Sequence, residues 1–254
     1  MRPLVIVPTY NERENLPKLA SELLAIPNLR ILVVDDGSPD GTGDVADELS
    51  RSSRGQVSVL RRTGKRGLGV AYIDGMRAAL QGDADVICQM DADLSHQPGD
   101  LVRMLAAVEH ADIVIGSRYV PGGRIVNWPL HRKVLSAAAN RYIRALCAVP
   151  VNDCTSGFRC WQRHALAAIP LDRITSEGYA FLVELLYEGV RRGSAVKEVP
   201  ITFIERRHGA SKLRASVLLE SAMLPWQIAF SSRRAPAGEA ARGTDPATLS
   251  RDAS

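Results

Sequence analysis

Short apolar runs alternate with segments of helical spacing along the first half of the chain. Residues 4–7, Leu-Val-Ile-Val, are apolar on both faces, as in a strand inside a parallel sheet. Leu16, Leu19 and Leu23 then recur at the spacing of one helix face. The same alternation predicts strands at residues 4–7, 30–34, 57–60, 86–90 and 111–116, and helices at residues 15–25, 45–49 and 67–79 and from Pro98 onward. This order is typical of a doubly wound α/β fold, whose site lies at the carboxyl ends of the strands.

The second half of the chain is predicted to add two helices and one strand. Residues 130–149 are amphipathic, and their apolar side consists of Leu130, Val134, Ala138, Tyr142, Leu146 and Val149. We interpret them as a core-facing helix, and the alternative is a helix that lies on anionic membrane lipid. A further helix is expected at residues 181–190 and a strand at residues 195–203, whereas residues 153–159 are interpreted as a polar loop.

Two stretches near the end of the chain bear on the domain limits and on membranes. Residues 217–230 are apolar, but Glu220 and Pro225 interrupt them and a membrane span needs about 20 residues, so no transmembrane helix is expected. Residues 231–254 contain almost no large apolar side chain, which predicts a disordered tail. Because 46% of the 254 residues are hydrophobic, the rest of the chain can bury the core of one large domain, expected at residues 1–230.

The charged residues divide the chain into an acidic and a basic half. Residues 1–115 hold 12 Lys and Arg against 17 Asp and Glu, whereas residues 116–230 hold 16 against 8. This division suits a first half that holds a cation and a second half that meets phosphates or an anionic surface. The four cysteines lack Cys-x-x-Cys spacing, which argues against a zinc site or a disulfide framework and indicates a reducing compartment. No secretory signal is expected, because no basic segment with a following apolar run is present, and the protein is predicted to be cytoplasmic.

Two aspartates at the end of a predicted strand are candidates for metal binding. Asp91 and Asp93 follow residues 86–90 and are separated by one residue, so both carboxylates point the same way in an extended segment. The hydroxyl of Ser95 adds a possible third oxygen, and together these groups suit one hard cation. The alternative is that the two carboxylates cap the helix that begins at Pro98 and solvate the loop before it.

Two other motifs resemble ligand-binding patterns, but their context argues against them. A nicotinamide-binding Rossmann domain has its glycines directly after the first strand, whereas Gly64, Gly67 and Gly69 come much later. Residues 36–47 resemble the start of a calcium-binding loop. A strand precedes them, however, and position twelve is Asp47 where Glu is required.

A basic segment with one glycine follows the last predicted strand. Arg206, Arg207 and Lys212 lie on either side of Gly209 in this segment. Fixed cations on a bendable loop can close over a diphosphate and stabilise a leaving group as its charge increases. A solvated turn is the alternative interpretation.

Six blocks of sequence, in order, resemble a known enzyme family. They are residues 8–16, 35–42, 67–72, 90–96, 116–119 and 200–203, the last followed by Arg206, Gly209, Ser211 and Lys212. On these blocks the chain resembles the glycosyltransferase family 2 enzymes of the polyprenyl-phosphate (dolichol-phosphate) mannose synthase type, over residues 4–230. The resemblance implies a GT-A type nucleotide-diphosphosugar transferase fold, an α/β fold with a mostly parallel sheet flanked by helices. It also implies a nucleotide-sugar half at residues 1–115 and an acceptor and membrane-facing half at residues 116–230.

The resemblance further implies which residues bind each substrate. The guanosine of a GDP-mannose donor would be held by Pro8, Tyr10, Glu12, Val34 and Asp36. The donor diphosphate would be bound by Asp91, Ala92, Asp93, Arg118, Arg206 and Lys212, and the expected catalytic residues are Asp93, Arg118, Arg206 and Lys212. Mg2+ or Mn2+ would be bound by Asp91, Asp93 and Ser95, and Arg132 and Ser136 would lie near the acceptor.

The implied reaction is a single transfer of mannose to a polyprenyl monophosphate with inversion. The metal and the basic segment would neutralise GDP as it leaves, while the ionised lipid phosphate attacks without a strong general base. The implied partners are the donor, the lipid, and the cytoplasmic face of a membrane or an integral membrane protein, and no nucleic acid. Two alternatives are a UDP-sugar-dependent polyprenyl-phosphate glucosyltransferase or related transferase, and a non-catalytic subunit of a membrane complex.

Overall fold

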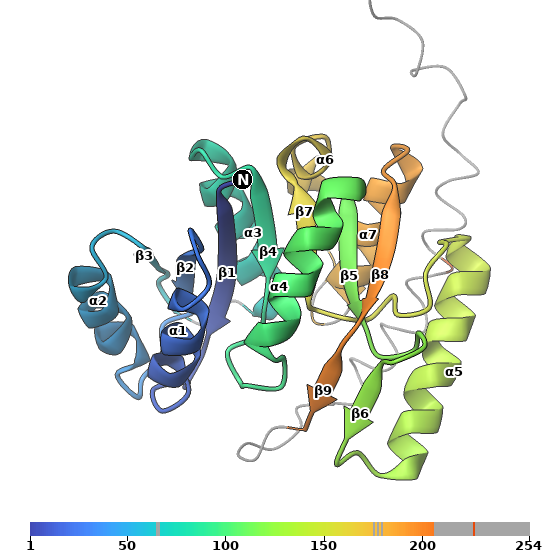
Figure 1. Cartoon of the computed structure of the whole chain (residues 1–254), viewed down its shortest axis with the longest axis horizontal. Helices are drawn as coiled ribbons and strands as arrows, with labels where there is room; N and C mark the ends of the chain where they lie inside the picture. Colours follow the sequence, from blue (N-terminus) through green and yellow to red (C-terminus); the bar gives the residue numbers. More distant parts are fainter. Residues whose placement is uncertain (65–66, 175, 177, 179, 206–225, 227–254) are drawn as a thin grey trace, which may run out of the picture.

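A sheet of seven strands lies at the centre of the molecule, between helices (Figure 1). The computed structural model describes residues 1–64, 67–174, 176, 178, 180–205 and 226. In spatial order the strands are β3 (Val57–Arg61), β2 (Arg30–Asp35), β1 (Pro3–Thr9), β4 (Val86–Gln89), β7 (Arg159–Gln162), β5 (Ile113–Ser117) and β8 (Val196–Pro200). β7 runs antiparallel to β4 and β5, and the other neighbours in this sheet are parallel. The prediction of a mostly parallel sheet flanked by helices is therefore confirmed.

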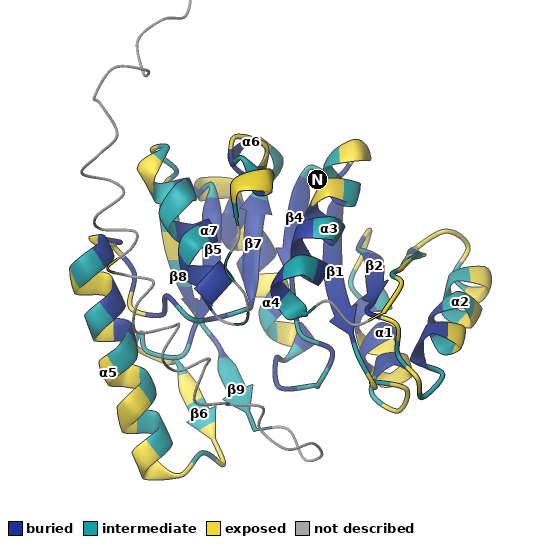
Figure 2. Cartoon of the chain, turned by 180° about the vertical axis from the view of Figure 1, so that it is seen from behind, coloured by how far each residue is buried: buried dark blue, intermediate teal, exposed yellow. Residues whose placement is uncertain are grey.

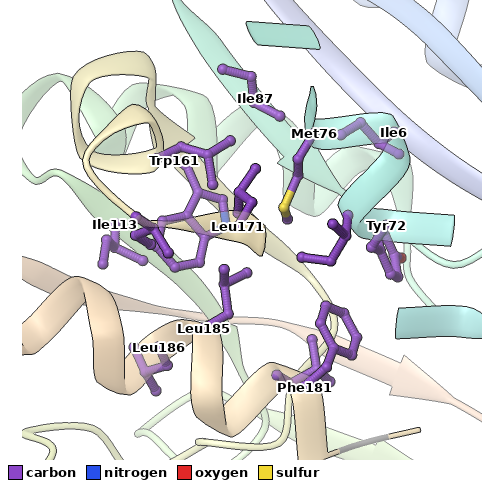
Figure 3. Packing of buried hydrophobic residues seen from close by; sticks show 14 of the residues in the cluster. Ile6, Tyr72, Met76, Ile87, Ile113, Trp161, Leu171, Phe181, Leu185 and Leu186 are labelled. Atoms are coloured by element: carbon purple, nitrogen blue, oxygen red, sulfur yellow. The ribbon is translucent and has the colours of Figure 1, made fainter. Parts of the chain in front are cut away.

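Helices lie on both faces of the sheet, and most of them bury apolar residues against it. The helices are α1 (Leu16–Leu24), α2 (Thr42–Ser52), α3 (Leu68–Gln81), α4 (Pro98–Ala107), α5 (Leu130–Cys147), α6 (Arg163–Ala167) and α7 (Ala180–Arg191), with short 3-10 turns η1 (Val108–His110) and η2 (Leu171–Arg173). On one face Tyr72, Met76, Trp161 and Phe181 belong to a core formed by α3, β7 and α7 (Figure 3). On the other face α1 and α4 cover the sheet. All seven residues of β1 are buried, because both faces of the sheet are covered.

Residues 153–158 form a loop, as predicted, whereas Arg159 already belongs to a strand. Most of these residues are buried, and they lead into β7, a strand that the pattern did not predict. Arg159 is fully buried and donates hydrogen bonds to the main-chain oxygens of Cys154, Ser156 and Leu182, at 2.6–2.8 Å. Burial lowers the pKa of Arg159 to about 10. These carbonyl partners, which lie outside β7, make a buried guanidinium tolerable at the start of the strand.

The single strand expected at residues 195–203 is divided into two strands of different sheets. β8 ends at Pro200, whereas β9 (Thr202–Ile204) pairs in parallel with β6 (Arg124–Val126), a strand that was not predicted. Proline has no N–H for a further ladder bond, which favours the end of β8 at this residue. Figure 1 shows β6 and β9 beyond the edge toward which β1 points. The small sheet therefore lies next to the carboxyl ends of the parallel strands.

The interpretation of residues 130–149 as a core-facing helix is wrong for the first turns of α5. Leu130, Val134 and Leu135 are 76%, 60% and 57% exposed. The buried residues of α5 are Asn140, Ile143 and Cys147. Figure 2 shows exposed and intermediate residues along the first half of this helix. The apolar side chains of the first turns therefore face outward from the part of the molecule that the structure describes, whereas the later turns pack against the core.

Among the residues that the structure describes, none of the helices is long and apolar enough to cross a membrane. The predicted tail at residues 231–254, and residues 217–230 apart from Trp226, lie outside the described residues. The predicted domain limits therefore stay predictions.

Candidate active site

The carboxyl ends of β1, β2 and β4 bring the predicted donor residues to one edge of the sheet. In the register of the sheet, Pro8 lies beside Val34 and Ile6 lies beside Gln89. The main-chain nitrogen of Asp36 donates to the carbonyl oxygen of Thr9 at 3.0 Å. Residues that follow the three strands, among them Tyr10, Glu12, Asp36 and Asp91, consequently start from the same edge. This arrangement is the one expected for a ligand site in an open α/β sheet.

Asp36 lies in a buried ion pair that the sequence analysis did not predict. Arg62, which follows β3, donates to its Oδ1 at 2.6 Å, and the main chain of Gly67 donates to its Oδ2 at 2.9 Å. The side chains of Arg62 and Asp36 are only 4% and 6% exposed. Nε of Arg62 lies 3.1 Å from Asp74, and its Nη2 is buried with no hydrogen-bond partner among the described residues. The carboxylate expected to recognise the nucleoside is thus already oriented by a cation.

The loop after β1 is held in place by residues of the next βα connection. The main-chain nitrogen of Glu12 donates to Thr42 Oγ1 at 2.9 Å, and Asn15 Nδ2 donates to the Glu12 carboxylate at 2.7 Å. Asp35, which lies beside the predicted residue Asp36, accepts hydrogen bonds from the hydroxyls of Thr9 and Ser38. Asp35 therefore orders this loop from within the protein.

A tight turn presents Asp91 and Asp93 after β4. Leu94, between Asp93 and Ser95, has a positive φ of 61°, a conformation that non-glycine residues adopt rarely. Ser95 is buried, and it donates to Asp93 Oδ1 from its hydroxyl at 2.5 Å and from its main chain at 3.1 Å. Ser95 thus orients the Asp93 carboxylate, a contact that the proposed role as a metal ligand did not include.

Tyr72 and Gly157 shape the surroundings of the Asp91 carboxylate. The fully buried Tyr72 donates from its hydroxyl to Asp91 Oδ1 at 2.8 Å. Burial, with the nearby Asp91 charge, raises the pKa of Tyr72 well above its usual value, so its hydroxyl stays protonated. A Cβ on Gly157 would lie 3.5 Å from Asp91 Oδ2, so the bare main chain keeps that side of the carboxylate open to other groups.

These groups fit a hard divalent cation that takes its other ligands from a substrate. Within the described part of the chain, no three His, Cys, Asp or Glu side chains are grouped so as to hold a metal. Asp91 and Asp93 supply two carboxylates, and Mg2+ is commonly held by one or two carboxylates together with substrate phosphates and water. The space that a Cβ on Gly157 would fill is consistent with such ligands beside Asp91.

The His96 side chain is buried next to the turn that carries Asp91 and Asp93. It is 2% exposed, its ring stacks on Phe158 at 4.9 Å between centroids, and it meets the edge of Phe203 at 5.5 Å. Nδ1 lies 3.4 Å from the main-chain nitrogen of Asp91. Burial lowers the pKa of His96, so the neutral ring supports the turn without adding charge.

Arg118 follows β5 and is bound to a buried carboxylate. Its Nε and Nη2 donate to the two oxygens of Asp153 at 2.8 and 2.7 Å, and its main-chain nitrogen donates to Asp153 Oδ2 at 2.9 Å. Nη2 also donates to Thr155 Oγ1 at 3.0 Å. The rings of Trp128 and Phe203 lie 5.7 and 5.4 Å from the guanidinium. The resemblance implied a phosphate for Arg118, whereas the described contacts join it to Asp153.

Arg132 and Ser136, the two residues expected near the acceptor, lie one turn apart on α5. The guanidinium of Arg132 stacks over Trp128, with 4.0 Å between Cζ and the ring centroid, and donates to Glu205. Ser136 is half-buried, and its carbonyl oxygen accepts from Asn140 Nδ2. The spacing of four residues puts both side chains on one face of the helix.

The two remaining catalytic candidates, Arg206 and Lys212, lie outside the described residues. Just before them, Ile204 donates from its main chain to the carbonyl oxygen of Ser95 at 3.0 Å. The chain therefore contacts the turn that carries Asp93 at Ile204, two residues before Arg206.

Several contributors to the site were missed by the sequence analysis. They are Arg62, Tyr72, Asp153, Gly157 and Glu205. One of them had a usable signal: Asp153 is the sole acidic residue between Asp112 and Asp172 in a basic half of the chain. The others depend on partners that are distant in sequence.

Residues 4–169 match the family model of glycosyl transferase family 2. The chain belongs to glycosyltransferase family 2. It is 50% identical over 222 residues to the polyprenol monophosphomannose synthase of Mycolicibacterium smegmatis, covering 87% of this chain and 84% of the relative. It is 49% identical over 222 residues to the undecaprenyl-phosphate mannosyltransferase of Micrococcus luteus, covering 87% and 91%. The prediction of an enzyme of this family is confirmed.

Solved structures of low sequence identity share the fold. A mannosyl-3-phosphoglycerate synthase from Rubrobacter xylanophilus superposes with a TM-score of 0.65 at 18% identity, covering 92% of this chain and 74% of that one. A mannosyltransferase from Pyrobaculum calidifontis, in complex with GDP-Man and Mn2+, gives a TM-score of 0.59 at 16% identity, covering 92% and 64%. These similarities confirm the predicted GT-A type fold.

Proposed function

We propose that this chain transfers mannose from GDP-mannose to the phosphate of a polyprenyl monophosphate, with inversion and release of GDP. The observation that carries the proposal is the meeting of two features at one edge of the fold. The turn with Asp91 and Asp93 suits a metal-bound diphosphate, and β9 connects that turn to the side of α5 that carries Arg132. The names of the relatives at about half identity support the same acceptor class and sugar.

In this proposal the protein holds the donor from both ends. Pro8, Tyr10, Glu12, Val34 and Asp36 bind the guanosine, and the ion pair with Arg62 orients the Asp36 carboxylate. Asp91 and Asp93, with the main chain at Ala92, would hold Mg2+ or Mn2+, and Ser95 fixes Asp93. Such a cation would supply stabilisation of the negative charge that develops on the leaving GDP.

The acceptor half supplies fixed positive charge. Arg132 and Ser136 bind the lipid phosphate, and Arg206 and Lys212 neutralise the leaving diphosphate. Arg118 stays paired with Asp153 and adds positive charge at the end of β5. An ionised phosphate is already a nucleophile near neutral pH, so this scheme requires no strong general base.

The exposed apolar residues of α5 suit contact with the membrane that contains the lipid. Leu130, Val134 and Leu135 are exposed on a helix that also carries His131, Lys133 and Arg141. Apolar side chains beside basic ones are the composition of helices that lie on anionic lipid. We therefore propose a peripheral protein on the cytoplasmic face of a membrane, either alone or with an integral membrane partner.

The test is transfer of labelled mannose from GDP-mannose to a polyprenyl phosphate, with and without Mg2+ or Mn2+, and with UDP-glucose in parallel. Metal-dependent formation of a mannolipid is the expected result. Product from UDP-glucose but not from GDP-mannose would refute the donor and keep the acceptor class. Absence of product from both donors, with folded protein and both metals, would refute the proposed reaction.

A further inference from the structure

The ion pair of Arg132 and Glu205 engages one of the two residues proposed to bind the acceptor. Nη1 of Arg132 donates to Glu205 Oε1, and the two side chains are 25% and 33% exposed. The guanidinium also lies flat over Trp128. In the described structure, therefore, the Glu205 carboxylate binds the guanidinium that is proposed to bind the acceptor phosphate.

The pair of Arg118 and Asp153 differs from this pair in its burial and in its hydrogen bonds. That pair is 8% and 0% exposed, has two parallel hydrogen bonds and includes a main-chain donor. Separating a buried pair leaves an uncompensated charge in the interior, which is strongly unfavourable. The pair of Arg132 and Glu205 is joined by a hydrogen bond from Nη1 and is partly open to water, so it contributes little and can exchange its anion.

Main-chain hydrogen bonds hold Glu205 near the turn that carries Asp91 and Asp93. Its nitrogen donates to the carbonyl oxygen of Val126 at 3.2 Å, and the preceding residue, Ile204, donates to Ser95 at 3.0 Å. A phosphate that approaches a sugar at this turn and also binds Arg132 consequently meets the Glu205 carboxylate. Two anions cannot share one guanidinium in a partly buried site without repulsion.

We propose that Glu205 is an internal anion that occupies Arg132 until the acceptor phosphate displaces it, and that it thereby sets the affinity for the acceptor. The inference rests on the proposed function, because it assigns Arg132 to the lipid phosphate. Glu205 acts through Arg132 and is a positioning residue. We expect its effect on acceptor binding, because the residues proposed to bind the guanosine lie on or directly after β1 and β2, away from Arg132.

The first experiment measures steady-state kinetics of Glu205→Gln in the full chain. Gln keeps the size and removes the charge. An exposed ion pair is worth about 0.2–1 kcal/mol, so we expect the acceptor KM to fall about 1.4- to 5-fold with an unchanged donor KM. Asp172→Asn is the matched control, because it removes the exposed carboxylate that pairs with Arg77 and should change neither constant. An acceptor KM that is unchanged or higher in Glu205→Gln would overturn the proposal.

The second experiment combines Glu205→Gln with Arg132→Gln and measures binding of a short-chain isoprenyl phosphate by calorimetry. Displacement at Arg132 requires that the gain in affinity disappears when Arg132 is absent. A gain of the same size in the Arg132→Gln background would show a general charge effect and overturn the inference. Because this measurement needs no turnover, it reports on Glu205 even if wild-type protein transfers no mannose from GDP-mannose, an outcome that refutes only the proposed reaction.

Discussion

Replacement of Gly157 by Ala tests whether a ligand uses the space beside the Asp91 carboxylate. The added Cβ would lie 3.5 Å from Asp91 Oδ2, 3.7 Å from Oδ1 and 3.9 Å from Cγ, which are ordinary van der Waals distances. The backbone of Gly157 does not have the positive φ that disfavours other residues. We therefore expect Gly157→Ala to fold normally, with an unfolding free energy equal to wild type or higher by about 0.4–1 kcal/mol.

The expected effect is on catalysis. In the proposed site a cation on Asp91 would bring diphosphate oxygens to the side of the carboxylate that the new methyl group enters. Displacement of reacting groups by about 1 Å can reduce the rate about 100-fold. This factor corresponds to about 2.7 kcal/mol of activation free energy.

The assay is kcat/KM for mannolipid formation at saturating Mg2+, together with thermal unfolding of the same samples. Gly189→Ala is the matched control, because its Cβ would lie 2.7 Å from Ile113 Cδ1, within the core and away from Asp91. An overpacking cost of about 1–3 kcal/mol against about 1 kcal/mol gained in helix propensity predicts lower stability with retained kcat/KM per folded molecule. If Gly157→Ala kept kcat/KM within twofold of wild type, no ligand would occupy this space.

Three further predictions follow from the proposed function. Asp91→Ala and Asp93→Ala should each remove most of the mannolipid formation because the metal is lost, and near wild-type turnover of either purified variant would contradict the assignment. Arg206→Ala should lower turnover with an unchanged far-UV circular dichroism spectrum, whereas unchanged steady-state kinetics would rule out a phosphate role. Leu130→Ser combined with Val134→Ser should weaken sedimentation with anionic vesicles at least tenfold, since burying each side chain is worth about 1.5–3 kcal/mol; equal binding would refute contact through α5.

The elements of the first half could be predicted because their signals are local. β1 is covered on both faces and must be apolar throughout, so residues 4–7 suffice to indicate it. α4 begins at Pro98 as predicted, because proline suits the first helical position and a missing N–H costs nothing there.

β7 could not be predicted in the same way. It begins with a fully buried Arg159, and its partners in the sheet are distant, since Cys160 lies beside Cys88. A buried charge is acceptable only where carbonyl oxygens converge on it, and here Leu182 of α7 provides one of them. The hydropathy pattern of residues 153–162 does not indicate these partners.

The first turns of α5 show a different limit of pattern reasoning. The spacing of Leu130 and Val134 predicts a helix, and α5 is one. Periodicity does not specify which surface a helix side meets, and the structure leaves these two side chains exposed.

The sequence by itself determined the alternation of strands and helices and the position of Asp91 and Asp93 at a strand end, because each depends on residues adjacent in the chain. Tertiary structure decided how the charges are paired. Arg118 joins Asp153 across 35 positions and Arg132 joins Glu205 across 73. Such pairs depend on strand order and on where β9 leaves the sheet, and charge interactions at these distances act through space, whatever the separation along the chain.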